Sequence, residues 1–126
     1  IIQHLYAVDK DINKHALLVC GDFNGEPFEQ FYDLIIKVNE LGLRDAYSIV
    51  PNGGAKEPTT IKYKGEGGSL LRRAIDYVFF TERTLRLTSY LELPINDLLI
   101  NEQGLPNLAY SSDHLSLVCD FKLVNS

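Results

Sequence analysis

Five polar residues adjoin or interrupt apolar segments of the sequence, and their types suit phosphate chemistry. Asp22 and Asn24 come directly after an apolar run, and because they are two residues apart they project to the same side of an extended chain. Asp76 lies in the middle of AIDYVFF, and Asp113 and His114 precede the alternating segment LSLVCDFKL. Three carboxylates, one carboxamide and one imidazole, without a paired Cys or His spacing, favour a hard cation and phosphate esters over zinc.

Ordinary structural roles compete with this interpretation. The Asp–Asn pair of GDFN is also what a turn would use, because both side chains hydrogen-bond to nearby backbone. A buried carboxylate needs a strong partner. For Asp76 that partner is either a preceding arginine, Arg72 or Arg73, or the imidazole of His114. Because the strand ends of one sheet meet at one rim, we expect Asp76 and His114 to be hydrogen-bonded there.

Four basic residues surround the turn that precedes Asp76. They are Lys62, Lys64, Arg72 and Arg73. Two interpretations stay open for this group, contacts to substrate phosphates and a solvated basic face of the protein.

The apolar spacing predicts the elements that would position these residues. A helix is predicted to begin at Pro27, which lacks only an N–H that the first turn does not use. Its apolar stripe comprises Phe28, Phe31, Tyr32, Ile35 and Ile36. Strands are predicted at 16–20, 59–64, 74–80, 85–93 and 115–123. The first of these is apolar on both faces, which is typical of a central strand covered on both sides. Residues 94–110 are predicted to be irregular.

Composition limits the function classes. The chain has 126 residues and a formal net charge of −5, whereas a duplex-binding module is normally basic. An enzyme that acts on phosphates is compatible with this charge, because bound cations change the local sign. Cys20 and Cys119 lie in apolar strand-like runs and are predicted to be buried thiols of a reducing compartment. The sequence contains no methionine, which indicates a fragment of a longer protein.

Three motifs in order, GDFN, IDYVFF and SDHLSLVCDF, resemble the C-terminal half of the endonuclease/exonuclease/phosphatase superfamily. GDFNGEP, EPTTIK and an LP shortly before YSSDHLSLVCDF are most similar to its nocturnin and carbon catabolite repressor-type deadenylase branch. The resemblance implies an α/β fold, a portion of a four-layer sandwich in which two packed mixed β-sheets are flanked by helices. Residues 1–126 would form the C-terminal half of a single domain whose upstream half is missing.

The resemblance also implies roles for the five polar residues. Asp22 would position or activate the attacking water and bind metal, and Asn24 would steady phosphoryl oxygens. His114 would bind the phosphate, held in place by Asp76, and Asp113 would lie on the metal side. The cofactor would be Mg²⁺, with Mn²⁺ as a substitute. An upstream Asn and a metal-binding Glu of the family are absent here, so we expect the chain alone to be inactive.

The implied substrates are a poly(A) tail, shortened from its 3′ end, or the 2′-phosphate of NADP(H). The implied setting is intracellular and chiefly cytoplasmic, with partners from mRNA-decay complexes and no membrane span. Two alternatives remain. One is another superfamily member, a 2′-5′ phosphodiesterase or a DNA-repair nuclease. The other is a catalytically dead scaffold, against which the retention of all five polar residues argues.

Overall fold

The computed structural model describes residues 4, 7, 9–37, 40–48 and 56–124. In chain order its elements are the 3₁₀ helix η1 (Ile12–Lys14), β1 (Leu18–Asp22), α2 (Gln30–Ile36), β2 (Leu43–Asp45), β3 (Thr60–Tyr63), β4 (Leu70–Arg73), β5 (Asp76–Thr81), β6 (Leu85–Tyr90), α3 (Leu98–Gln103) and β7 (Cys119–Leu123). The predicted α/β class is confirmed, and every strand pairing in the described residues is antiparallel. No helix among these residues is long and apolar enough to cross a membrane.

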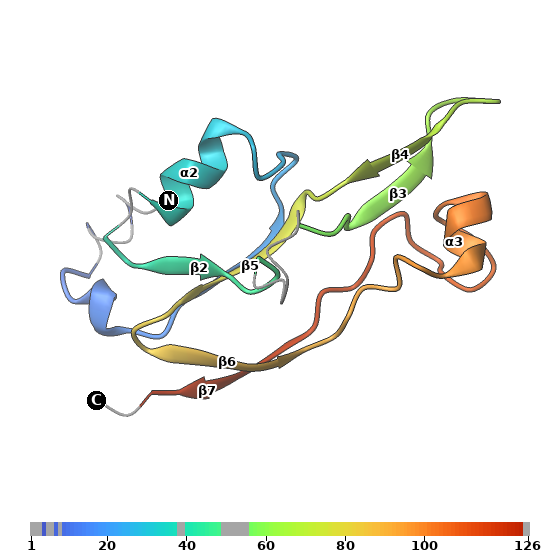
Figure 1. Ribbon diagram of the computed structural model, residues 1–126. Coiled ribbons are helices and arrows are strands. Elements are labelled where there is room, and N and C mark those ends of the chain that lie inside the picture. Colours follow the sequence, from blue (N-terminus) through green and yellow to red (C-terminus); the bar gives the residue numbers. More distant parts are fainter. Residues whose placement is uncertain (1–3, 5–6, 8, 38–39, 49–55, 125–126) are drawn as a thin grey trace.

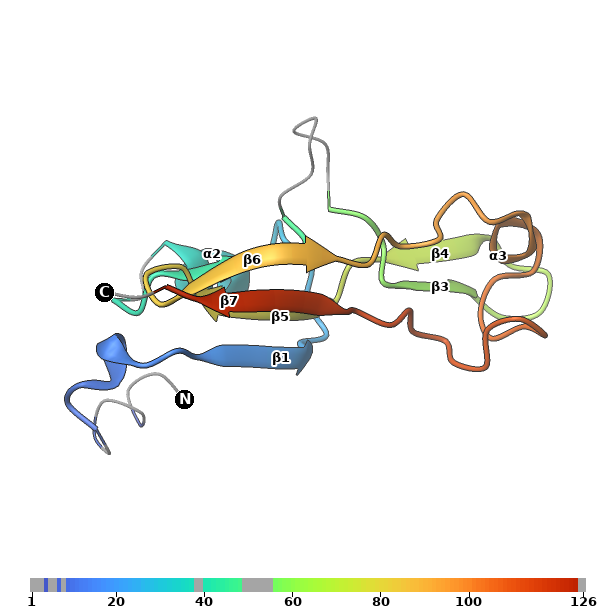
Figure 2. The same cartoon turned by 90° about the horizontal axis from the view of Figure 1, so that it is seen from below.

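Strand β5 is the centre of the fold. It pairs with β1 on one edge and β2 on the other, in a sheet of order β1-β5-β2. Figure 1 shows this sheet between α2 on one side and the β6–β7 pair on the other. Two further pairs, β3–β4 and β6–β7, complete the strands of the described residues. β3, β4 and α3 lie together at one end of the molecule (Figure 2).

The side chains of β5 alternate between two apolar clusters, as the period of a strand requires. Tyr77 and Phe79 pack toward α2 in one cluster. Val78 and Phe80 pack in the other, against the residues of β6 and β7. The ring centroids of Phe80 and Phe121 are 5.1 Å apart, which joins β5 to β7. The resulting layers are a helix, a sheet and a second sheet.

The strand predicted at residues 16–20 is present as β1, but the expectation that it is central is wrong within the described residues. Strand β1 lies at the edge of its sheet, and Leu18 is 51% exposed. An apolar sequence does not by itself make a strand central. Within the described residues β1 is paired on one edge, by β5, and its other edge is unpaired. The same placement leaves Cys20 exposed, contrary to the prediction of a buried thiol, while Cys119 is partly buried and both are free cysteines.

Helix α3 occupies a segment that was expected to be irregular. The Asp97 side chain caps it by accepting hydrogen bonds from the N–H groups of Leu99, at 2.9 Å, and Ile100, at 3.2 Å. Gly104 ends it with a φ of 69°, which an L side chain rarely adopts. The predicted helix after Pro27 is present as α2, but it begins at Gln30 and leaves Phe28 exposed.

A buried ion pair attaches Lys56 to β2. The Lys56 Nζ lies 2.7 Å from Asp45 Oδ2, and the two side chains are 4% and 0% exposed. The same ammonium sits 3.8 Å from the centre of the Tyr77 ring. Burial lowers the pKa of Lys56, and the Asp45 carboxylate opposes that shift. The pair therefore depends on both partners, because removing one leaves an uncompensated buried charge.

Candidate active site

Two carboxylates face each other where β1 ends and β5 begins. The antiparallel register places Asp22 directly opposite Asp76. Like charges in that position destabilise a strand pair. The His114 ring lies between them, with Nδ1 2.9 Å from Asp76 Oδ2 and Nε2 4.0 Å from Asp22 Oδ2. One ligand atom from each of the three residues lies within 4.8 Å of the others.

His114 is held in this position by Thr60, the first residue of β3, and by Thr59, which precedes it. Thr60 forms an antiparallel bridge with His114, and the Leu115 N–H donates to the Thr59 carbonyl at 2.7 Å. Pairing with the start of β3 therefore holds the segment before β7 against the rim of the β1–β5 pair. The hydrogen bond between Asp76 and His114 that the sequence predicts is present in the structure.

The alternative ion pair of Asp76 with an arginine is not formed. Arg73 Nε lies 3.6 Å from Glu26, and Arg72 donates to the Asn101 side chain at 2.6 Å. Asp76 Oδ2 instead accepts a hydrogen bond from the Thr59 hydroxyl at 2.5 Å. Sequence reasoning did not include Thr59 among the site residues, because a threonine at the start of a strand is an ordinary β-former.

Asp22 serves both the turn and the site. Its Oδ1 accepts the Asn24 N–H at 2.7 Å, which is the turn interaction. Its Oδ2 faces the imidazole. Asn24 has a φ of 52°, an uncommon conformation for a residue other than glycine. No side-chain hydrogen bond ties the Asn24 carboxamide to another described residue, so this exposed group is available to a ligand.

Asp113 lies beside the three-residue group and outside it. Its carboxylate accepts a hydrogen bond from Lys62 Nζ at 3.3 Å, and that bond holds the pKa of Asp113 below its usual value. Its carbonyl accepts the Thr60 hydroxyl at 2.7 Å. The expected role of Asp113 toward a metal therefore stays a prediction.

The pleat of the β3–β4 hairpin determines on which face each basic residue of the hairpin lies. Thr60 pairs with Arg73, Ile61 with Arg72 and Lys62 with Leu71. Since alternate residues of a strand face opposite sides, Lys62 and Arg73 share the face of Thr60. Arg73 also donates to the Asn24 carbonyl at 3.3 Å.

The other two basic residues do not reach the site in the same way. Arg72 is on the opposite face of the hairpin, against Asn101 of α3. Lys64 follows the end of β3 and is exposed. The structure thus brings Lys62 and Arg73 to the site.

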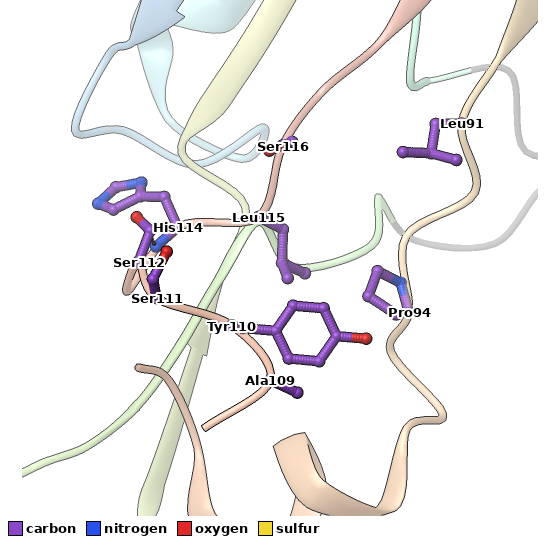
Figure 3. A pocket seen from close by; sticks show the side chains of 9 residues that line it. All are labelled: Leu91, Pro94, Ala109, Tyr110, Ser111, Ser112, His114, Leu115 and Ser116. Atoms are coloured by element: carbon purple, nitrogen blue, oxygen red, sulfur yellow. Dashed lines mark hydrogen bonds between the residues drawn. The ribbon is translucent and has the colours of Figure 1, made fainter. Parts of the chain in front are cut away.

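Two hollows adjoin the site on different sides. A hollow of about 230 Å³ lies between the β1–β5 pair and the segment before β7, and Asp76 is in its wall with Cys20, Val78, Leu115 and Leu117. A second, of about 320 Å³, is drawn in Figure 3. Tyr110 and Leu115 point into it, whereas the His114 ring points away from it. His114 is nevertheless one of the residues that line this second hollow.

Comparisons with known proteins identify relatives of this chain. No protein-family model matches the chain. Nocturnin from Rattus norvegicus is 39% identical over 121 residues, 96% of this chain and 28% of that protein. Nocturnin from Homo sapiens is 38% identical over 121 residues, covering 96% and 27%. The solved structure of the human nocturnin catalytic domain with a bound sulfate anion has a TM-score of 0.70 at 34% identity, covering 98% of this chain and 38% of that one.

The chain is a nocturnin relative of the endonuclease/exonuclease/phosphatase superfamily.

A more distant similarity reaches a second group. The 2′,5′-phosphodiesterase 12 of Mus musculus is 24% identical over 137 residues, 96% of this chain and 22% of that protein. The chain spans little more than a quarter of the length of the curated nocturnins that it matches.

The residues of this nocturnin relative fit part of a divalent-cation site. Both oxygens of Asp76 lie within hydrogen-bond distance of His114 Nδ1, and Oδ2 also accepts the Thr59 hydroxyl. Asp22 Oδ2 is the carboxylate oxygen of the group that remains open to a cation. Mg²⁺ is commonly held by one or two carboxylates together with waters and substrate phosphates, so one open carboxylate is a reasonable share of its ligands.

The opposed carboxylates generate a stability prediction. Asp22→Asn removes one of two facing negative charges while its side-chain oxygen can still accept the Asn24 N–H. In metal-free buffer near pH 8, we expect the free energy of unfolding of the full-length protein to rise by about 0.2–1 kcal/mol. Urea denaturation measures the change. Asp120→Asn is the matched control, because Asp120 pairs across β6–β7 with a serine. Equal effects of the two substitutions would contradict a repulsion specific to the site.

Proposed function

We propose that this chain is the C-terminal half of one catalytic domain that hydrolyses phosphate esters in the manner of nocturnin and the deadenylases. The observation that carries the proposal is the imidazole of His114, bound to Asp76 on Nδ1 and directed toward Asp22 on Nε2. The similarity to nocturnins over nearly the whole chain supports it. The weaker similarity to 2′,5′-phosphodiesterase 12 makes that activity the second candidate.

Each group has a task that its geometry allows. Asp22 Oδ2 orients an attacking water and accepts its proton, since this oxygen is free of the turn. The exposed Asn24 amide donates to a phosphoryl oxygen. Asp76 accepts the Nδ1 proton of His114, so the ring presents a donor at Nε2 when it is protonated. That imidazolium then stabilises the charge that develops on the phosphoryl group, which is the main requirement of phosphoryl transfer.

We assign Mg²⁺ as the cofactor, with Mn²⁺ as a substitute. Asp22 would hold it, together with a glutamate from the upstream half of the domain. Asp113 is the second candidate ligand on this chain and would have to leave Lys62. When bound, the cation supplies Lewis acidity and a water of lowered pKa.

The substrate is either poly(A) RNA or the 2′-phosphate of NADP(H). Both present anionic phosphates, and Lys62 and Arg73 lie on the face where such phosphates would bind. Lys64 follows the end of β3 and is exposed, so its contact to a phosphate stays a prediction. We place the enzyme inside the cell, chiefly in the cytoplasm, where recruitment by an mRNA-decay complex would bring it to messages.

Replacement of the imidazole tests the proposal. In the full-length protein, His114→Ala should reduce turnover of poly(A) or NADP(H) by about 10²–10³-fold, the usual cost of removing a donor to the developing charge. His15→Ala is the control, because His15 is exposed and pairs with Asp9 at 2.9 Å. Rates are measured with Mg²⁺ on each substrate and on a 2′-5′-linked oligonucleotide. A wild-type protein that binds poly(A) without hydrolysing any of the three would establish the scaffold alternative.

The two arginines should differ in their effect on substrate binding. Arg73→Ala should weaken poly(A) binding and reduce the slope of log K against log salt concentration by about 0.7, the value for one contact to single-stranded phosphate. Arg72→Ala should leave both unchanged, because Arg72 is directed to Asn101. Binding titrations at several salt concentrations measure the slopes. Equal slopes for Arg73→Ala and wild type would show that this face of the hairpin is only solvated.

The chain without an upstream half should be inactive and self-associating. Leu18, Val118 and Leu123 are each at least half exposed, and the outer edge of β1 is unpaired among the described residues. Light scattering should show oligomers, and addition of the upstream half should restore both a defined complex and hydrolysis. A monodisperse monomer of this chain with robust turnover would contradict the half-domain proposal.

A further inference from the structure

The hydrogen bonds of the Thr59 hydroxyl define which group donates and which accepts. The residue precedes β3 and is fully buried. Its hydroxyl oxygen accepts the N–H groups of Ile75 and Asp76, each at 3.1 Å. A hydroxyl has two acceptor positions and one proton. Because both acceptor positions are taken, the proton is left for Asp76 Oδ2, which lies 2.5 Å away.

The backbone of Thr59 bonds to the end of β4 and to the segment that carries His114. Its N–H donates to the Arg73 carbonyl at 2.9 Å, just before β5. Its carbonyl accepts the Leu115 N–H at 2.7 Å, one residue beyond His114. The neighbouring residue, Thr60, bridges to His114. Thr59 is thus bound both to the strand that supplies the carboxylate and to the segment that supplies the imidazole.

We infer that Thr59 is a positioning residue for the Asp76–His114 pair. Its hydroxyl holds the Asp76 carboxylate in the orientation in which it accepts the Nδ1 proton of His114, and this keeps Nε2 directed toward Asp22. Among the described residues no hydrogen bond joins the Thr59 side chain to the imidazole, so Thr59 acts through Asp76. The catalytic consequence rests on the proposed function, whereas the effect on the ring does not.

Two substitutions separate the hydroxyl from the rest of the side chain. Thr59→Val keeps the shape and removes the hydroxyl, and Thr59→Ser keeps the hydroxyl. In the full-length protein we expect Thr59→Val to lower kcat by about 10–100-fold, the usual effect of losing a partner of this kind, with KM nearly unchanged. Thr59→Ser should restore most of kcat.

Thr81→Val is the matched control for the loss of a buried hydroxyl. Thr81 lies at the far end of β5, is 1% exposed, and its hydroxyl oxygen accepts the Leu17 N–H at 3.0 Å. Its removal should lower the unfolding midpoint and leave kcat unchanged. If Thr59→Val does not fold, Thr59→Cys against Thr59→Ser makes the same comparison, because the two side chains differ only in sulfur and oxygen.

A second readout does not require turnover. For the neutral form of the wild-type ring, the ¹⁵N spectrum should show the proton of His114 on Nδ1. Thr59→Val should increase the fraction with the proton on Nε2, and Thr59→Ser should not. A wild-type tautomer ratio and wild-type kcat in Thr59→Val would overturn the inference. A shifted ratio in a protein whose wild type hydrolyses neither substrate would uphold the positioning and refute the proposed function.

Discussion

The opposition of Asp22 and Asp76 is the constraint on which the rest of the site depends. Two carboxylates in register across an antiparallel pair repel each other, and a positive or proton-donating group between them offsets that repulsion. His114 is that group, and the Thr59 hydroxyl takes part of the Asp76 charge. The fold therefore places two carboxylates at one rim of the sheet. The imidazole that lies between them comes from a segment distant in sequence. A site that binds phosphate through a cation needs this kind of local charge balance.

The alternation of β5 decides which side the site faces. Asp76, Val78 and Phe80 share the face that packs toward β6 and β7, and the segment carrying His114 passes over that face. Tyr77 faces α2, where its hydroxyl lies 2.8 Å from the Gly25 carbonyl and so ties the GDFN turn to β5. A slip of one residue in the pairing would exchange the two faces and turn the carboxylate toward α2. The well-packed aromatic cluster around Tyr77 makes such a slip costly, so packing on one face specifies chemistry on the other.

The sequence predicts the parts of this arrangement that depend on local pattern. Polar residues next to apolar strands indicated the rim, and the isolation of Asp76 among apolar neighbours indicated a strong partner. The edge position of β1 was not predictable, because an apolar run does not reveal which neighbours cover it. Helix α3 was not predicted, although Asp97 and Gly104 are typical residues for the start and end of a helix. A segment this short between Pro94 and Pro106 is also typical of a loop. The difference between Arg72 and Arg73 needed the register of β3 and β4, which sequence alone does not define.

The ion pair between Lys62 and Asp113 at the rim is suited to exchanging one partner for a ligand. Lys62 and Asp113 are each nearly half exposed, and pairs of that exposure contribute little to stability. The pair nevertheless keeps the Lys62 ammonium near the imidazole before any ligand is present. Under the proposed function, a phosphate would be a stronger partner for Lys62, because an anion with several acceptor oxygens forms charge-assisted hydrogen bonds. Its arrival would release the Asp113 carboxylate, which is then free to face a metal ion. Substrate and metal would in this way favour each other's binding, without a change in the strands that hold the site.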